Sequence, residues 1–457
     1  MSDFIKFRSQ YPEFVYRSYD LTETDDSINI SYHFQITGLS EFSPQWKIKK
    51  YTSRSFSDDK TLNNLVFSLG LVELISYWKI TCSPLVKIDC GSLDDKQVEW
   101  WKTQYFNGLG EFFYRNGIDT DIDSFMNIIS VASDCTETIV SENPGTTLSG
   151  CLIPVGGGKD SIVTLDLLSE MSEDNLCYLI NRRNSIYQSA YNSGYNDTDI
   201  VLANRTLDKN MLRLNSEGFL NGHTPFSAIV AFSAVIAAYI NGKKYVVLSN
   251  EASANESTVK DSYVNHQYSK SFEFENDFVN YEKQYINSGV FYFSILRPLS
   301  EFQIAKYFSG LTSYHKIFRS CNVGSKSDSW CGNCSKCLFV CLILSPFIEY
   351  ETLCDILGNN IADREDMLET FRKLIGLTDE KPFECVGSRE EINFSVTQAI
   401  KNREAENKKL PYLFEYYKST DLFNQYCNKE NPLHTFYNSI NNLPEQFEQI
   451  LKNKCFK

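Results

Sequence analysis

A run of three glycines, Gly156 to Gly158, constrains this chain more than any other feature of its sequence. The apolar residues 151–155 before it predict a buried strand, and the spacing of Ile162 and Leu165 after it predicts the inner face of a helix. Glycine permits the tight backbone turn that joins the two. A strand, a glycine turn and a helix N-terminus direct unpaired N–H groups to one point, which predicts a site for an anionic phosphate.

The residues after the glycines distinguish this loop from a Walker loop. In a Walker loop the lysine adjoins the hydroxyl residue, whereas here Asp160 separates Lys159 from Ser161. The pattern resembles the S-G-G-x-D-S loop of the PP-loop ATP pyrophosphatases, with Gly156 in place of the first serine. The resemblance implies cleavage of ATP between its α- and β-phosphates; the alternative is a glycine turn without a ligand. We expect the phosphates to be bound by Gly156, Gly157, Gly158, Lys159, Asp160 and Ser161.

Composition and charge exclude several classes of protein. Of 457 residues, 42% are hydrophobic and 22% charged, which is typical of globular chains. The net charge of −14 argues against a large nucleic-acid interface, which needs a basic excess. The apolar run 228–240 is shorter than the roughly 18–20 residues of a membrane span, and residues 1–14 contain no secretory signal. We therefore expect a cytoplasmic protein without a nucleic-acid or membrane partner, whose 14 cysteines stay reduced, bind metal or pack.

The first predicted domain, residues 1–145, mixes α and β structure. Strict alternation of apolar and polar residues predicts a strand at 27–36, and helical spacing predicts helices at 62–78 and 97–113. The last of these contains two glycines, at 108 and 110. Either the close approach of another group or a break in the helix would explain them.

The second predicted domain, residues 150–345, alternates strands with helices. This order favours a parallel doubly wound sheet, in which ligands bind at the carboxyl ends of the strands. The glycine loop lies at such an end. Residues 346–457 have helical periodicity and form the third predicted region. We predict an α/β fold of PP-loop type, with a doubly wound, mostly parallel sheet, an N-terminal α+β region and a helical C-terminal region.

Four cysteines form the pattern C-x9-C-x2-C-x2-C. Two-residue spacers let neighbouring thiolates face one tetrahedral ion, which predicts a structural zinc site. The arrangement is similar to the zinc site of 7-cyano-7-deazaguanine synthases, which are also PP-loop enzymes. Buried free thiols or a redox pair are the alternatives. The predicted ligands are Cys321, Cys331, Cys334 and Cys337.

Two polar segments, residues 249–257 and 265–275, follow the strand predicted at 245–248. Their carboxylate, imidazole and ammonium groups are expected at the same edge of the sheet as the glycine loop. A solvated charged loop is the alternative. Their position after the strand favours substrate binding.

With these residues assembled, most of the chain resembles the ATP-dependent UDP-N-acetylmuramoyl-L-alanyl-L-glutamate epimerases of the MurL type. The resemblance depends on the motifs at 108–112, 154–161, 249–256 and 265–273 and on the cysteine cluster. It implies that UDP-MurNAc-L-Ala-L-Glu and ATP are the substrates. It also implies that the terminal L-glutamate is inverted to D-glutamate, with release of AMP and pyrophosphate.

A physical account of this reaction follows from the resemblance. Adenylation removes the carboxylate charge that opposes loss of the α-proton, after which a base and an acid exchange that proton. Lys159 would hold the pyrophosphate, and Asp160 would position Mg²⁺. The groups available for proton exchange are Glu251, His266, Lys270 and Glu273. The expected substrate contacts are Asn250, Ser253, Asn255 and Asn265.

Two other functions compete with this interpretation. The cysteine cluster suits a PP-loop ligase or synthase of the 7-cyano-7-deazaguanine type, although the additional terminal regions disfavour it. A nucleotide-binding sensor that does not turn over would be a protein of another class. The presence of Lys159, Asp160 and Ser161 together argues against the sensor.

Overall fold

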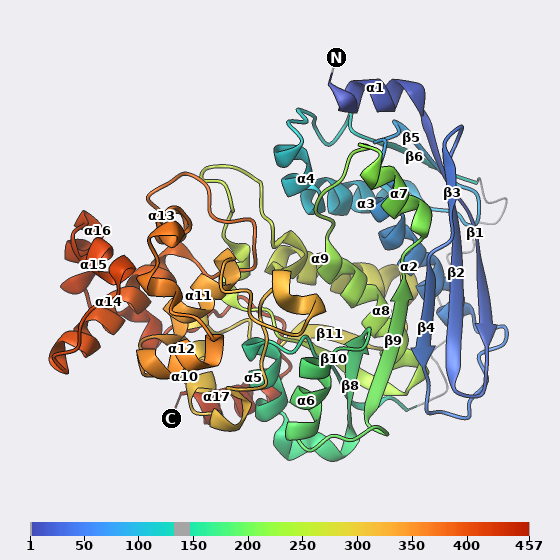
Figure 1. Cartoon of the computed structure of the whole chain (residues 1–457). Coiled ribbons are helices and arrows are strands. Elements are labelled where there is room, and N and C mark those ends of the chain that lie inside the picture. Colours follow the sequence, from blue (N-terminus) through green and yellow to red (C-terminus); the bar gives the residue numbers. More distant parts are fainter. Residues whose placement is uncertain (1, 132–146, 457) are drawn as a thin grey trace.

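The β-strands of this chain join into one mixed sheet in the computed structural model, which describes residues 2–131 and 147–456 (Figure 1). The strand order is β11-β10-β7-β8-β9-β4-β2-β1-β5-β6, with β3 paired to β2. The strands are β1 Glu13–Glu23, β2 Ser27–Ile36, β3 Ser40–Phe42, β4 Gln45–Lys49, β5 Leu85–Ile88, β6 Asn127–Ser130, β7 Ser149–Pro154, β8 Asn175–Ile180, β9 Ile200–Thr206, β10 Lys243–Leu248 and β11 Phe291–Ser294.

Helices connect and cover these strands, and they alone make up the regular structure after β11 within the described residues. The helices before β11 are α1 Asp3–Gln10, α2 Lys60–Trp78, α3 Asp95–Gly108, α4 Gly110–Arg115, α5 Lys159–Leu167, α6 Asn184–Asn192, α7 Lys209–Ser216, α8 Phe226–Ile240 and α9 Phe272–Tyr281. Those after it are α10 Glu301–Ser309, α11 Ser335–Leu344, α12 Tyr350–Leu357, α13 Leu368–Ile375, α14 Arg389–Ala405, α15 Tyr412–Lys418, α16 Asp421–Cys427 and α17 Glu445–Cys455.

Five neighbouring strands, β11-β10-β7-β8-β9, are parallel. From β7 the chain adds β8 and β9 on one side, and it later adds β10 and β11 on the other. The strand order therefore reverses between β7 and β10. In open α/β sheets a reversal of this kind creates a crevice at the carboxyl ends of the strands, and the glycine loop follows β7 there.

The N-terminal strands extend this same sheet through an antiparallel pair of β4 with β9. The sequence predicted the N-terminal strands as part of a separate α+β region and did not foresee this pairing. The predicted α/β class and helical C-terminal region are confirmed, whereas the sheet is mixed and includes the N-terminal strands, so it is wider than the mostly parallel sheet that the sequence predicted. The predicted boundary at residue 145 lies outside the described residues.

Alternate residues of the central strands pack into two cores on opposite faces of the sheet, as the period of two in a strand requires. Leu152 of β7 joins a core with α2 and α8, whereas Ile153 joins one with α5, α10 and α11. In β10, Val246 likewise joins the core with α2 and α8, and Val247 joins the core with α5, α10 and α11. Helices thus cover both faces of the parallel strands. Within the described residues, no helix combines the length and apolar character that a membrane crossing requires.

The helix predicted at 97–113 is two helices, α3 and α4, which meet at Leu109. Both explanations for its glycines hold. The helix breaks after Gly108, and a Cβ added at that glycine would lie 2.8 Å from Cγ of Pro225, the residue directly before α8. The close contact therefore places the end of α3 against the start of α8.

Candidate active site

The glycine loop forms an open cradle between β7 and α5. Gly157 has φ +77°, a conformation that favours glycine, and its carbonyl accepts from the N–H of Arg319 at 2.8 Å. A Cβ added at Gly156 would meet no atom within 4 Å. Gly158 begins α5 without a side-chain cap, while the Ser161 hydroxyl donates to its carbonyl at 3.0 Å. The cradle and the uncapped helix fit a phosphate group.

Three carboxylates gather beside this loop, from Asp160, Glu251 and Glu301. One oxygen of each lies within 4.8 Å of the others. Asp160 is in the first turn of α5, Glu251 follows β10, and Glu301 begins α10 after β11. Three neighbouring strands therefore supply the cluster. Carboxylate oxygens are the ligands that Mg²⁺ prefers beside nucleotide phosphates, so these residues fit such an ion.

The ammonium group of Lys159 binds the carboxylates of Asp160 and Glu301. Lys159 and Glu301 are each 1% exposed. Burial raises the pKa of Glu301 to about 8 despite the lysine, whereas the pKa of Asp160 is lowered because Lys159 outweighs the effect of burial. Lys159 therefore favours the charged form of Asp160, whereas burial disfavours that of Glu301.

A thiol that the sequence did not single out, Cys385, lies beside Lys270 and His266. Burial raises the pKa of this thiol, but Lys270 and a hydrogen bond with His266 outweigh that effect and lower it to about 6. The ammonium group of Lys336, on α11, donates to the Cys385 carbonyl. Lys270 also faces Glu251, which connects the thiol to the carboxylate cluster. No motif around residue 385 could have revealed this arrangement.

The imidazole of His266 binds Glu111, a residue of the 108–112 motif to which the sequence assigned no role. His266 Nδ1 lies 2.5 Å from Glu111 Oε2. Burial lowers the pKa of His266, but Cys385 and Glu111 outweigh it and raise it to about 9. The ring of His223 lies 4.4 Å from that of His266 between centroids, and burial together with His266 lowers its pKa to about 3. A protonated imidazole thus lies against a neutral one at neutral pH.

Arg297 fixes the spacing between the two polar segments. This residue is completely buried, and its guanidinium group donates to the carbonyl of Glu251 at 2.8 Å and to that of Lys270 at 2.6 Å. It also forms an ion pair with Glu275 at 2.9 Å. Because one side chain binds both backbones, Glu251 and Lys270 are held at the same end of β11.

The remaining predicted residues lie in different environments. Asn255 accepts from the N–H of Phe272 at 2.8 Å, and Asn265 donates to the Ala254 carbonyl at 2.9 Å, so both stabilise the local backbone. The Asn250 backbone exchanges two hydrogen bonds with the Ser294 hydroxyl, at 2.6 and 2.7 Å.

Two further predicted residues contrast in exposure. Ser253 is buried, and its hydroxyl has no partner among the described residues. Glu273 is exposed on the first turn of α9, and it is not one of the carboxylates gathered beside Lys159. The structure therefore brings Glu251 and Lys270 close to Asp160 of the glycine loop, places His266 beside Cys385 and Glu111, and leaves Glu273 outside these groups.

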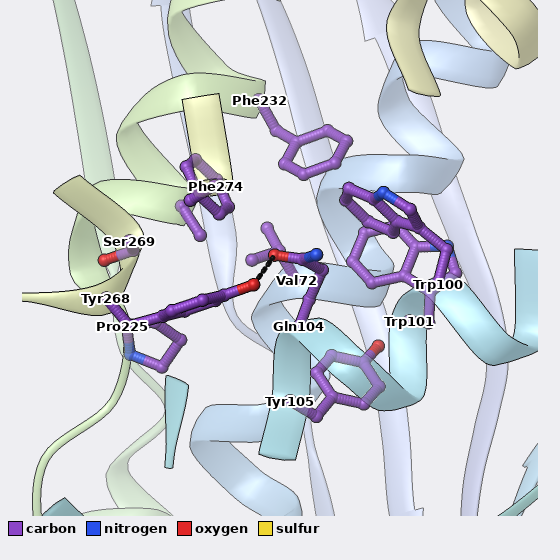
Figure 2. A pocket seen from close by; sticks show the side chains of 11 residues that line it. Val72, Trp100, Trp101, Gln104, Tyr105, Pro225, Phe232, Tyr268, Ser269 and Phe274 are labelled. Carbon is purple, nitrogen blue, oxygen red and sulfur yellow. Dashed lines mark hydrogen bonds between the residues drawn. The ribbon is translucent and has the colours of Figure 1, made fainter. Parts of the chain in front are cut away.

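A small aromatic pocket adjoins the 265–273 segment. Figure 2 shows Tyr268 and Phe274 facing Trp100, Trp101 and Phe232 across it. The Tyr268 hydroxyl donates to the Gln104 side chain at 3.3 Å, and the amide nitrogen of that glutamine has no partner among the described residues. The aromatic side chains around this pocket pack the 265–273 segment, which carries His266 and Lys270, against α3.

The four predicted metal ligands come together at the start of α11. Their Sγ atoms all lie within 4.8 Å of one another. The Cys321–Cys334 and Cys331–Cys337 separations are each 3.8 Å, and Cys334–Cys337 is 3.5 Å. At a Zn–S bond length of about 2.3 Å, tetrahedral sulfur atoms lie about 3.8 Å apart, so the cluster fits zinc.

The chain is similar to known proteins over both halves. The MurL N-terminal domain model matches residues 6–295, and the MurL C-terminal domain model matches residues 313–420. Curated proteins named UDP-N-acetyl-alpha-D-muramoyl-L-alanyl-L-glutamate epimerase are similar to this chain. The protein from Xanthomonas oryzae pv. oryzae is 34% identical to it over 71% of each chain. The protein from Salinispora tropica is 34% identical to it over 73% of each chain. Another, from a Micromonospora species, is 32% identical over 72% of this chain and 73% of its own. No solved structure matches significantly.

Proposed function

The chain belongs to the MurL family of epimerases, and from this premise we propose that it inverts the terminal L-glutamate of UDP-N-acetylmuramoyl-L-alanyl-L-glutamate. The product would carry D-glutamate at the same position and serve as a peptidoglycan precursor. The observation that carries this proposal is the match of both family domains, which together include the glycine loop, His266 and Cys385.

We further propose that ATP activates the glutamate carboxylate in a PP-loop type of site. The open glycine cradle and the uncapped N-terminus of α5 support phosphate binding at the reversal of strand order. A carboxylate oxygen would form a bond to the α-phosphorus while the bond from that phosphorus to the pyrophosphate breaks. Mg²⁺ held by Asp160, Glu251 and Glu301 would supply positive charge to the phosphates.

Activation would make the α-proton removable. The negative charge of a free carboxylate opposes the formation of a second negative charge on the adjacent carbon. In an acyl-adenylate the carboxylate charge is absent, so this opposition is removed. The proximity of Glu251 to Asp160 and the interaction of Lys270 with both support a role for these residues in proton exchange, whereas Glu273 is exposed on α9. Water would then release AMP. Because ATP is abundant there, we expect the reaction in the cytoplasm.

The test is incubation of the purified protein with ATP, Mg²⁺ and the UDP-muramoyl dipeptide. We expect AMP, pyrophosphate and D-glutamate to appear together, as measured by ³¹P NMR and by chiral analysis of the hydrolysed product. Formation of ADP instead of AMP would contradict the PP-loop proposal. AMP formation with a deazaguanine carboxylate but not with the dipeptide would favour the synthase alternative.

A further inference from the structure

Glu111, His266 and Cys385 form a line of three interacting side chains. Glu111 lies in the first turn of α4, His266 lies in the 265–273 segment, and Cys385 lies in the loop before α14. The carboxylate binds His266 Nδ1 at 2.5 Å, and the imidazole forms a hydrogen bond with the thiol. A carboxylate, an imidazole and a thiol in this order form the arrangement in which a base and its orienting group activate sulfur.

The surroundings of Cys385 favour its thiolate. Lys270 and Lys336 on two other elements also act on the sulfur electrostatically. The neighbouring Glu384 is the charged group nearest in sequence, and its side chain binds Asn322. Three cations thus offset the desolvation of one anion. The lowered pKa of about 6 leaves most of Cys385 ionised at neutral pH.

The other groups beside the thiol cannot accept a proton at neutral pH. His266 is held protonated between Glu111 and Cys385, with a pKa of about 9. Lys270 has a raised pKa because Cys385 and Glu251 outweigh the effect of burial. A base must be unprotonated before it acts, so of these three groups the thiolate alone is ready.

We propose that Cys385 removes or returns the α-proton of the activated glutamate, with Glu111 as the positioning residue of His266. This proposal rests on the proposed function. The Cα–H bond breaks, its electron pair moves into the activated carbonyl group, and the proton forms an S–H bond. A proton donor on the opposite face of the carbon then completes the inversion, and the thiol, whose pKa lies below neutral pH, loses its proton to solvent water.

The experiment separates activation from proton exchange in Cys385→Ser and Cys385→Ala. Pyrophosphate release reports activation, and deuterium incorporation at the α-carbon in D₂O reports exchange. We expect exchange to fall by at least ~100-fold in both variants, because a positioned base contributes about that much, while pyrophosphate release changes little. Cys427→Ser, which removes a thiol on α16, is the matched control and should retain both activities.

Near wild-type deuterium exchange in Cys385→Ser would overturn the proposal. A covalent UDP-muramoyl dipeptide adduct on Cys385 during turnover would also overturn it, since the sulfur would then be a nucleophile. If the wild-type protein releases no pyrophosphate with the dipeptide, the proposed function fails instead.

A measurement on the wild-type protein keeps the test independent of folding in the variants. The rate of iodoacetamide alkylation at Cys385, followed by peptide mass spectrometry, should rise with a midpoint near pH 6. Cys427 provides the reference thiol. A midpoint above pH 8 would contradict a thiolate at neutral pH.

Discussion

The carboxylate cluster beside the glycine loop and the group of three side chains around Cys385 differ in how the chain assembles them. Asp160, Glu251 and Glu301 follow β7, β10 and β11, three neighbouring parallel strands that end at one edge. Glu111, His266 and Cys385 instead come from α4, the 265–273 segment and the loop before α14. The sheet alone therefore positions the first cluster, whereas the second requires the N-terminal region, the polar segment and the C-terminal region to be packed together.

The two groups also differ in charge. The first cluster gathers three carboxylates, two of which bind Lys159, and this set suits a metal ion and phosphates. In the second, cations surround one thiolate, which suits a base in a desolvated site. Lys270 faces both groups, and Arg297 fixes its backbone. This division implies that activation and proton exchange can be impaired separately.

The largest expected effect is that of Asp160→Asn, which removes a carboxylate charge from the first cluster. Pyrophosphate release should fall by ~1,000-fold, because a preorganised charge at a phosphate site contributes about that much. Deuterium exchange should fall equally, since exchange depends on activation. Parallel measurement of the two rates tests both statements.

Glu273→Gln is the matched control, because it removes a carboxylate from an exposed position on α9. Both rates should remain within about twofold of wild type, as is usual for exposed positions away from a site. Deuterium exchange that persists in Asp160→Asn without pyrophosphate release would contradict the coupling of the two steps.

An intermediate effect is expected for Glu111→Gln, which keeps the shape of the side chain but removes its charge. Loss of this anion lowers the pKa of His266 and therefore deprives Cys385 of a cation, so the pKa of the thiol rises. At pH 7 deuterium exchange should fall by ~10-fold, and the acid limb of its pH profile should move to higher pH. Pyrophosphate release should be unchanged.

Other titratable side chains surround the group formed by Glu111, His266 and Cys385. His223 and Arg115 lie near Glu111, and Lys270 and Lys336 lie near the thiol. Arg115→Gln is an informative comparison, since it removes a cation from the outer side of Glu111 and leaves His266 in place. Its pH profile should stay close to that of wild type. An unchanged profile in Glu111→Gln would show that Glu111 only supports the fold.

The smallest expected effect is that of Cys331→Ser, which removes one predicted zinc ligand. Lys336 lies between two of the cysteines and binds the Cys385 carbonyl, while Asn322 follows Cys321 and binds Glu384. The cluster therefore supports the loop that carries the thiol. We expect bound zinc to be lost, the unfolding temperature to fall by about 5 °C, and exchange to fall more than pyrophosphate release.

Elemental analysis, calorimetry and the two rate assays check this outcome. Cys427→Ser should keep its zinc and its unfolding temperature. A wild-type protein that contains no zinc after purification without chelators would instead favour the alternative of free thiols.

Local sequence patterns predicted the elements that depend on near neighbours. The alternation at 27–36 gives β2, and the helical spacing at 62–78 gives α2, which begins at Lys60 directly after its Asp59 cap. The continuous sheet was not predictable, because the pairing of β4 with β9 joins residues more than 150 positions apart and leaves no periodic signal. The same reason explains why Glu111 and Cys385 were missed as partners of His266.

The sequence by itself determined the glycine loop, its Lys-Asp-Ser extension, the spacing of the four cysteines and the two polar segments between β10 and β11. Each is a local pattern, and its chemistry follows from residue types a few positions apart. Only the tertiary structure decided that Glu301 joins Asp160 and Glu251, and that Cys385 lies against His266 and Lys270. Charge balance in a buried site depends on which distant segments pack together, and that is a property of the whole fold.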